Sequence, residues 1–210
     1  MQTLTIKNLK RTSSEIILEN QTELVAIDQL NWPDYQYKPE VKFRIGHDGR
    51  NILLKFYVHE KSIRAEASET NGDVYKDSCV EFFISPHADG WYYNFEFSCI
   101  GTRHVGYGNG RHNRVPVPKE IVENIKVSST LGSKPFSEKQ GDFKWELFVK
   151  IPISCFIHDD FTSFEGMGAK GNFYKCGDEL AEPHFITWNP VKTKNPDYHQ
   201  HQYFSDLLFE

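Results

Sequence analysis

The chain has few methionines and little helical periodicity. Only 2 of its 210 residues are Met, whereas 16 are Phe, 10 are Tyr and 4 are Trp. Aromatic and β-branched side chains favour pleated, half-buried strands. Apolar residues seldom recur at helical spacing, and only PKEIVENI, residues 118–125, could form a short helix. These deficits argue against a helical bundle and predict a fold built from strands.

Long apolar runs are also missing. No stretch approaches the roughly 20 apolar residues that a membrane-spanning helix needs. The opening MQTLTIKNLKRTSSEIILEN lacks the continuous apolar segment of a secretory signal. We therefore expect a soluble protein in the cytoplasm that does not bind membranes.

The chain has no excess of positive charge. It carries 24 Lys and Arg against 29 Asp and Glu, a formal net charge of -5. Such a balance gives no general attraction to a polyanion. We predict no nucleic-acid partner and expect a neutral or weakly charged ligand instead.

Cysteine is sparse, and no CxxC spacing occurs. The four residues, Cys79, Cys99, Cys155 and Cys176, are an even number. Disulfide frameworks belong mainly to small exported domains, and this chain is larger, with no visible export signal. We expect reduced, mostly buried thiols.

Several segments alternate between apolar and polar residues in the period of a strand. They are NILLKFYVHE (51–60), CVEFFIS (79–85), WYYNFEFSC (91–99) and KWELFVKIP (144–152). In 91–99 one predicted face holds Trp91, Tyr93, Phe95, Phe97 and Cys99, and the other holds Tyr92, Asn94, Glu96 and Ser98. Each segment therefore predicts a strand with one face in the core.

The turn signals predict how these strands pair. PHADG lies between residues 79–85 and 91–99 and is typical of the loop of an antiparallel hairpin. There is no internal repeat, linker or low-complexity segment. The pattern predicts an all-β fold in one domain, residues 1–210: an antiparallel β-sandwich, immunoglobulin-like or jelly-roll-like, with long loops and little helix.

Cofactor motifs are weak. His199-x-His201, with Asp197 nearby, would lie on one face of a strand, but no third ligand is indicated. The loop GTRHVGYGNGRHNR, residues 101–114, lacks the GK[ST] of a phosphate loop and is interpreted as a hairpin loop beside a binding face. The only internal Met, Met167, lies in a glycine-rich loop and does not favour haem. We predict no metal and no other cofactor.

Glu81 and Glu96 lie on the two strands that are predicted to pair, away from the aliphatic faces. Two such carboxylates could act as general acid and base on a glycoside. They could equally accept hydrogen bonds from sugar hydroxyls. Non-catalytic use is favoured because no pattern in the sequence separates their pKa values.

Three stretches follow one another in a characteristic order. The first is VAIDQLNW followed by PEVKFRIGHDGRNILLKFYVHE. The second is VYKDSCVEFFISP followed by YYNFEFSCIGT, and the third is WELFVKIP followed by GNFYKC, ITWNP and YHQHQYFSDLLFE. Over residues 24–210 this order resembles the family 9 carbohydrate-binding modules, in the broader group of DOMON-like β-sandwiches.

The resemblance implies a site that holds the end of a sugar between two aromatic rings. By position the rings are Tyr75 and Tyr198, where the best-known modules carry Trp. Glu81 matches the acidic hydrogen-bonding position, and Glu96 stands where a family arginine contacts the ligand. The amide near the second ring would come from Asn195 or be replaced by Asp197. The complete implied sugar-binding set is Tyr75, Tyr198, Glu81, Glu96, Asn94, Asn195 and Trp188, the last as core or cleft wall.

We therefore expect a protein that binds a mono- or oligosaccharide without catalysis and has an accessory role in carbohydrate catabolism. Two alternatives remain open. One is a glycoside-processing enzyme that uses Glu81 and Glu96. The other is a β-sandwich interaction protein that has lost the sugar site.

Overall fold

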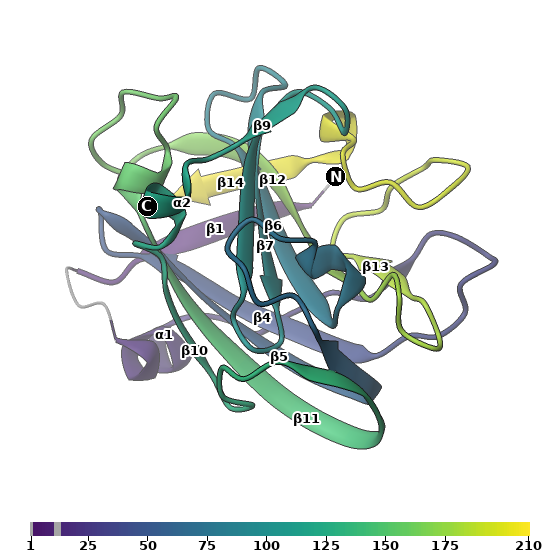
Figure 1. Cartoon of the computed structure of the whole chain (residues 1–210). Coiled ribbons are helices and arrows are strands. Elements are labelled where there is room, and N and C mark those ends of the chain that lie inside the picture. Colours follow the sequence, from purple (N-terminus) through teal and green to yellow (C-terminus); the bar gives the residue numbers. More distant parts are fainter. Residues whose placement is uncertain (1, 11–13) are drawn as a thin grey trace.

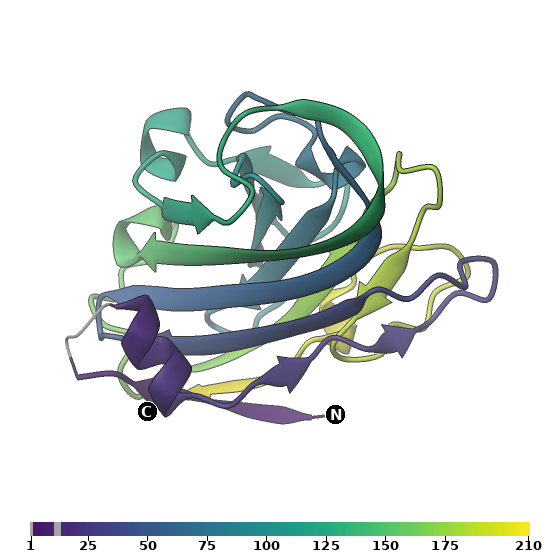
Figure 2. The same ribbon diagram turned by 90° about the horizontal axis from the view of Figure 1, so that it is seen from below.

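Two layers of strands pack face to face in the computed structural model, which describes residues 2–10 and 14–210 (Figure 1). The first layer runs in the order β10 (Lys126–Ser129), β11 (Phe136–Pro152), β5 (Asn51–Ala65) and β4 (Glu40–His47), with β2 (Val25–Ala26) on β4. Figure 2 shows β4, β5 and β11 side by side.

The second layer runs in the order β14 (Ser205–Phe209), β12 (Gly168–Cys176), β6 (Cys79–Ser85), β7 (Tyr92–Ser98), β8 (Arg103–Gly108) and β9 (Arg114–Pro116). The short β13 (Phe185–Thr187) pairs with β12, and β3 (Gln29–Leu30) pairs with β13. Single turns of 3₁₀ helix are η1 (Val74–Lys76), η2 (Ile153–Cys155) and η3 (His201–Tyr203).

The main core lies between the two layers. Phe43 of β4 stacks on Phe173 of β12 with ring centroids 3.9 Å apart, and Phe173 stacks on Phe82 of β6 at 4.7 Å. The alternate apolar residues of the segments 51–60, 79–85 and 144–152, beginning with Ile52, Val80 and Trp145, belong to this core. The all-β sandwich is confirmed, as is the hairpin of β6 with β7.

One strand departs from the predicted antiparallel arrangement. β1 (Thr3–Asn8) pairs in parallel with β14 through its first four residues and with β4 through Lys7 and Asn8. It therefore joins the two layers along one edge. A parallel pair needs a long connection in the chain, so no local turn signal marks it.

Helix is scarce, as expected, but one helix was not predicted. α1 (Glu15–Gln21) begins at Ser14, whose hydroxyl accepts a hydrogen bond from the Ile17 amide, and it buries Leu18. The predicted short helix at 118–125 is α2 (Lys119–Val122). Among the described residues, no helix has the length and apolar character needed to cross a membrane.

The outer face of the second layer carries its own buried cluster, and the candidate site is built on it. Phe83 of β6, Tyr92 of β7 and Tyr174 of β12 point away from the main core and pack with Tyr198 and Phe204 from the C-terminal segment. The prediction that Trp91 points inward is wrong, because it lies before β7 and is 41% exposed.

Candidate functional site

A pocket of about 240 Å³ opens on this outer face. Its floor comes from β6, β7 and the end of β12, and its walls come from η1, the β8–β9 turn and residues 196–199. The volume lies below the range of about 300–1,000 Å³ that is usual for ligand pockets, and it suits a small ligand or the end of a larger one. The lining residues are Tyr75, Glu81, Glu96, Arg111, His112, Arg114, Cys176, Asp178, Phe185, Pro196, Asp197, Tyr198 and His199.

Two buried carboxylates form the floor. Glu81 of β6 and Glu96 of β7 are direct cross-strand partners and are 3% and 4% exposed. Burial, and then the negative charge of Glu96, raise the pKa of Glu81 well above its usual value. Asn94 donates a hydrogen bond to Glu96 at 2.8 Å, and Arg114 Nη1 lies 3.5 Å from the same carboxylate. Burial and the neighbouring carboxylate therefore both favour the protonated form of Glu81.

Both predicted tyrosines line the pocket, in different ways. Tyr75 is half-buried on η1. Tyr198 is only 7% exposed: its ring stacks on Tyr174 at 4.1 Å, and its hydroxyl donates to the Lys175 carbonyl at 2.9 Å. Tyr198 is therefore a fixed wall rather than a ring that projects from a loop.

Two guanidinium groups line the pocket, that of Arg111 from the β8–β9 turn and that of Arg114 from the start of β9. Arg114 Nη1 is 2.9 Å from His199 Nε2, and Tyr92 Oη is 3.0 Å from His199 Nδ1. Because arginine can only donate, Nε2 must accept and Nδ1–H donates to Tyr92. Burial and the charges of Arg114 and Arg111 lower the pKa of His199 to about 2, so the ring is neutral.

The two histidines of the His-x-His motif do not form a pair. His199 points to Arg114 and Tyr92 in a segment without regular structure, whereas His201 is exposed at the start of η3. The prediction that both share one face of a strand is wrong. The prolines and polar residues before them interrupt any strand alternation.

The remaining predicted site residues lie around the pocket or away from it. Asn94 is fully buried beneath Glu96 and orients that carboxylate. Asn195 is exposed and does not line the pocket, whereas Asp197 does. Trp188 is 2% exposed in the main core, edge-on to Phe43 and Phe173, so of its two predicted places it takes the core.

Several lining residues were not predicted for the site. Arg111, His112 and Arg114 belong to the glycine-rich loop that was interpreted only as a neighbour of a binding face. Asp178, just after β12, has its pKa raised to about 6, chiefly by burial. Because β6, β7, β8 and β9 pair in chain order, the β8–β9 turn lies next to Glu96. Antiparallel pairing of successive strands is therefore the signal that could have located the arginines.

A family model described as carbohydrate-binding family 9 matches residues 12–209, nearly the whole chain. The chain belongs to carbohydrate-binding family 9. No curated protein matches it. A crystal structure of a Bacteroides uniformis ATCC 8492 protein, to which carbohydrate binding has been ascribed, is 42% identical, with a TM-score of 0.95 over 100% of this chain and 99% of that one.

More distant family 9 modules share the fold. A Caldicellulosiruptor kristjanssonii module in complex with glucose is 10% identical, with a TM-score of 0.60 over 100% of this chain and 96% of that one. A module from the same organism in complex with cellotriose is 11% identical, with a TM-score of 0.60 over 100% and 94%. At such identities the likeness concerns the fold alone.

A second hollow in this family 9 chain has a different character. It lies between Asn8, Asn51 and Thr162 and has a volume of about 730 Å³. Among its described lining residues there is no aromatic ring. It is therefore a weaker candidate for stacking on a sugar than the pocket that contains Tyr75 and Tyr198.

Proposed function

We propose that the protein binds the end of a mono- or oligosaccharide in the Tyr75–Tyr198 pocket, without transforming it, as an accessory to carbohydrate catabolism. The apolar C–H face of a pyranose stacks on aromatic rings, while its rim hydroxyls need directed hydrogen bonds. The pocket offers both kinds of contact within a volume of about 240 Å³.

The observation that carries the proposal is the convergence of distant segments on one pocket. Tyr75 comes from η1, Glu81 and Glu96 from the β6–β7 hairpin, and Tyr198 from the segment before η3. Arg114 and Asp197 add a donor and an acceptor at the rim. Membership of family 9 and the sugar complexes of structurally similar modules support the same ligand class.

Isothermal titration calorimetry tests the proposal. We expect a panel that includes glucose, cellotriose and other mono- and oligosaccharides to contain a ligand, and Tyr75→Ala to weaken its binding about tenfold, a loss of about 1.4 kcal/mol. Tyr75 is preferred to Tyr198 because the Tyr198 ring also packs on Tyr174.

The matched control is Trp91→Ala. Trp91 is an exposed aromatic residue that stacks on Tyr107 and does not line the pocket, so its loss should leave the affinity unchanged. Equal binding by wild type and Tyr75→Ala would remove the stacking model.

Glycoside hydrolysis remains a second candidate function because of one observation. Glu81 is held toward its protonated form beside the Glu96 carboxylate, and an acid next to a carboxylate is the arrangement that glycosidases use. Turnover of aryl glycosides that disappears in Glu81→Gln would establish it. Sugar binding without turnover in the wild type would favour the non-catalytic function.

A further inference from the structure

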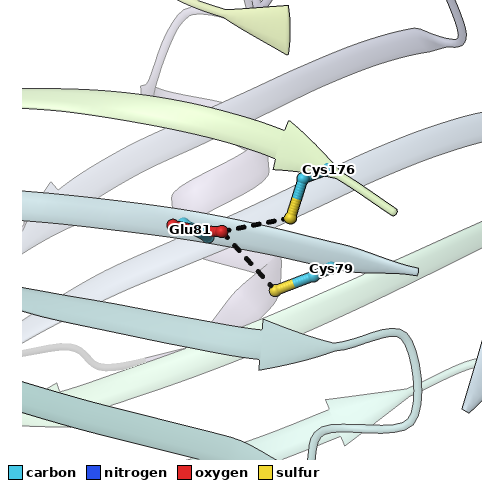
Figure 3. A group of neighbouring side chains, drawn as sticks. All are labelled: Cys79, Glu81 and Cys176. Carbon is cyan, nitrogen blue, oxygen red and sulfur yellow. Dashed lines mark hydrogen bonds between the residues drawn. The ribbon is translucent and has the colours of Figure 1, made fainter. Parts of the chain in front are cut away.

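Two thiols and a carboxyl group converge on one point beneath the pocket. Cys79 of β6 and Cys176 of β12 are direct cross-strand partners. Cys176 Sγ lies 3.2 Å from Glu81 Oε1, and Cys79 Sγ lies 4.0 Å from the same oxygen. Figure 3 shows both sulfur atoms directed at this carboxylate, and the three donor atoms all lie within 4.8 Å of one another.

This donor set has the chemistry of a metal site. Thiolate sulfur and a carboxylate oxygen suit Zn²⁺, which takes Cys and Glu ligands at about 2.3 and 2.0–2.2 Å. The cross-strand pairing holds the two cysteine backbones side by side, and binding a cation requires the side chains to close inward on it. Burial raises the pKa of Cys79 to about 12 and also raises the pKa values of Cys176 and Glu81, so all three ligands are protonated until a cation displaces their protons.

A further carboxylate stands beside the cluster. Asp178 follows β12 two residues after Cys176, interacts with the Cys176 thiol and lines the pocket. Its backbone amide donates to the Tyr75 carbonyl at 3.2 Å, which holds it at the pocket wall. Cys79 is fully buried, whereas Cys176 and Glu81 line the pocket, so a cation bound here would be reached from the pocket side.

We propose that Cys79, Cys176 and Glu81 bind a thiophilic divalent cation of the zinc class at the floor of the pocket, with Asp178 or water in the fourth position. Binding displaces the protons of the two thiols and of the Glu81 carboxyl group, and these protons pass to solvent. The inference does not depend on sugar binding and is tested without sugar. The sequence alone does not indicate the site, because only the register of β6 with β12 brings the two cysteines together.

The test is a titration of the reduced, chelator-treated full chain with Co²⁺, a spectroscopic substitute for Zn²⁺, followed by competition with Zn²⁺. We expect a sulfur-to-cobalt charge-transfer band that Zn²⁺ abolishes. Losing even an outer partner of a metal ligand typically weakens binding by about 10- to 100-fold, so Cys176→Ser should weaken it by about 100-fold or more.

The matched control is Cys155→Ser. Cys155 is also a buried free thiol, but it donates to the Ile121 carbonyl and lies outside the cluster. It should titrate like the wild type. Equal metal affinity in Cys176→Ser and Cys155→Ser would overturn the proposal.

X-ray absorption spectroscopy of the zinc-loaded wild type gives a result that does not depend on how any variant folds. We expect a sulfur shell at about 2.3 Å together with an oxygen shell. A shell of nitrogen and oxygen alone, or no metal retained after dialysis, would overturn the proposal.

Discussion

His199 holds two other residues of the pocket wall region, Arg114 and Tyr92, through its imidazole ring. Its neutral ring accepts from Arg114 and donates to Tyr92, so it links β9 to β7. Its pKa is lowered from 6.5 to about 2 by burial and by the charges of Arg114 and Arg111. Between these pH values the unfolded chain takes up a proton that the folded chain does not. This residue therefore makes the protein less stable as pH falls below 6.5 and has no such effect at higher pH.

We predict that His199→Gln makes stability less dependent on pH. Glutamine retains an acceptor for Arg114 but does not titrate, so the slope of unfolding free energy against pH should fall by up to about 1.4 kcal/mol per pH unit. Urea denaturation at pH 5 and pH 7 measures the slope. An identical slope in both proteins would show that folding does not lower the pKa of His199.

Sequence alone predicted some site residues and missed others for physical reasons. The alternation of residues 79–85 and 91–99 put Glu81 and Glu96 on the outer face, and the structure places them there as partners. The family resemblance indicated Tyr75 and Tyr198, and both line the pocket. The packing of Tyr198 on Tyr174 depends on a long-range contact that no local pattern encodes.

Between elements, the close approach of β7 and β8 supports the pocket floor. Gly106 of β8 faces Asn94 of β7, and a Cβ at position 106 would come within 2.7 Å of Asn94 Oδ1. Asn94 in turn donates to Glu96. The absence of a side chain at Gly106 therefore leaves room for the residue that orients the carboxylate.

We predict that Gly106→Ala lowers the free energy of unfolding by about 1–3 kcal/mol, because extra volume in a packed site is costly, and weakens sugar binding by displacing Asn94. Gly110→Ala is the control, since a Cβ there meets no atom within 4 Å. Chemical denaturation and calorimetry measure both effects. Equal results for the two variants would contradict this role of Gly106.

Lys55 of β5 is one of the contacts that hold α1 on the first layer, beside the Tyr57–Glu19 hydrogen bond and the packing of Leu18 on Leu53. Lys55 Nζ lies 2.7 Å from carboxylates of Glu15, Glu19 and Glu146. Lys55→Met leaves these three groups without their cation. Because the carboxylates are partly exposed, we expect a modest destabilisation of about 1–3 kcal/mol, measured by urea unfolding, with unchanged sugar affinity. A loss of sugar binding would show that the two regions are coupled.

Secondary structure was predictable where a local signal exists. The alternation of apolar and polar residues predicted β5, β6, β7 and the C-terminal part of β11, residues 144–152. The PHADG loop predicted the β6–β7 hairpin. The parallel pairing of β1 depends on segments far away in the chain. α1 has a capping serine but buries only Leu18, so its apolar periodicity is too weak to mark it.

In the whole molecule, the main core and the proposed sugar pocket lie on opposite faces of one layer. The inner face of β6, β7 and β12 packs in the main core, while the outer face forms the pocket. Pocket substitutions such as Tyr75→Ala should therefore leave the core intact.

A ligand that binds only the folded state should stabilise the whole molecule. At a sugar concentration of about 100 times Kd we expect a gain of about 2.7 kcal/mol and a higher Tm. Thermal unfolding with and without sugar measures the shift, and Tyr75→Ala should show a smaller one. An equal shift in both proteins would place binding elsewhere on the fold.

The most direct test of the central claim is a crystal structure of the protein with the sugar that binds most tightly in the calorimetric panel. We expect one sugar ring in the pocket, in contact with Tyr75 and Tyr198 and hydrogen-bonded to Glu96 or Arg114. Sugar bound at another surface, with this pocket unchanged, would contradict it.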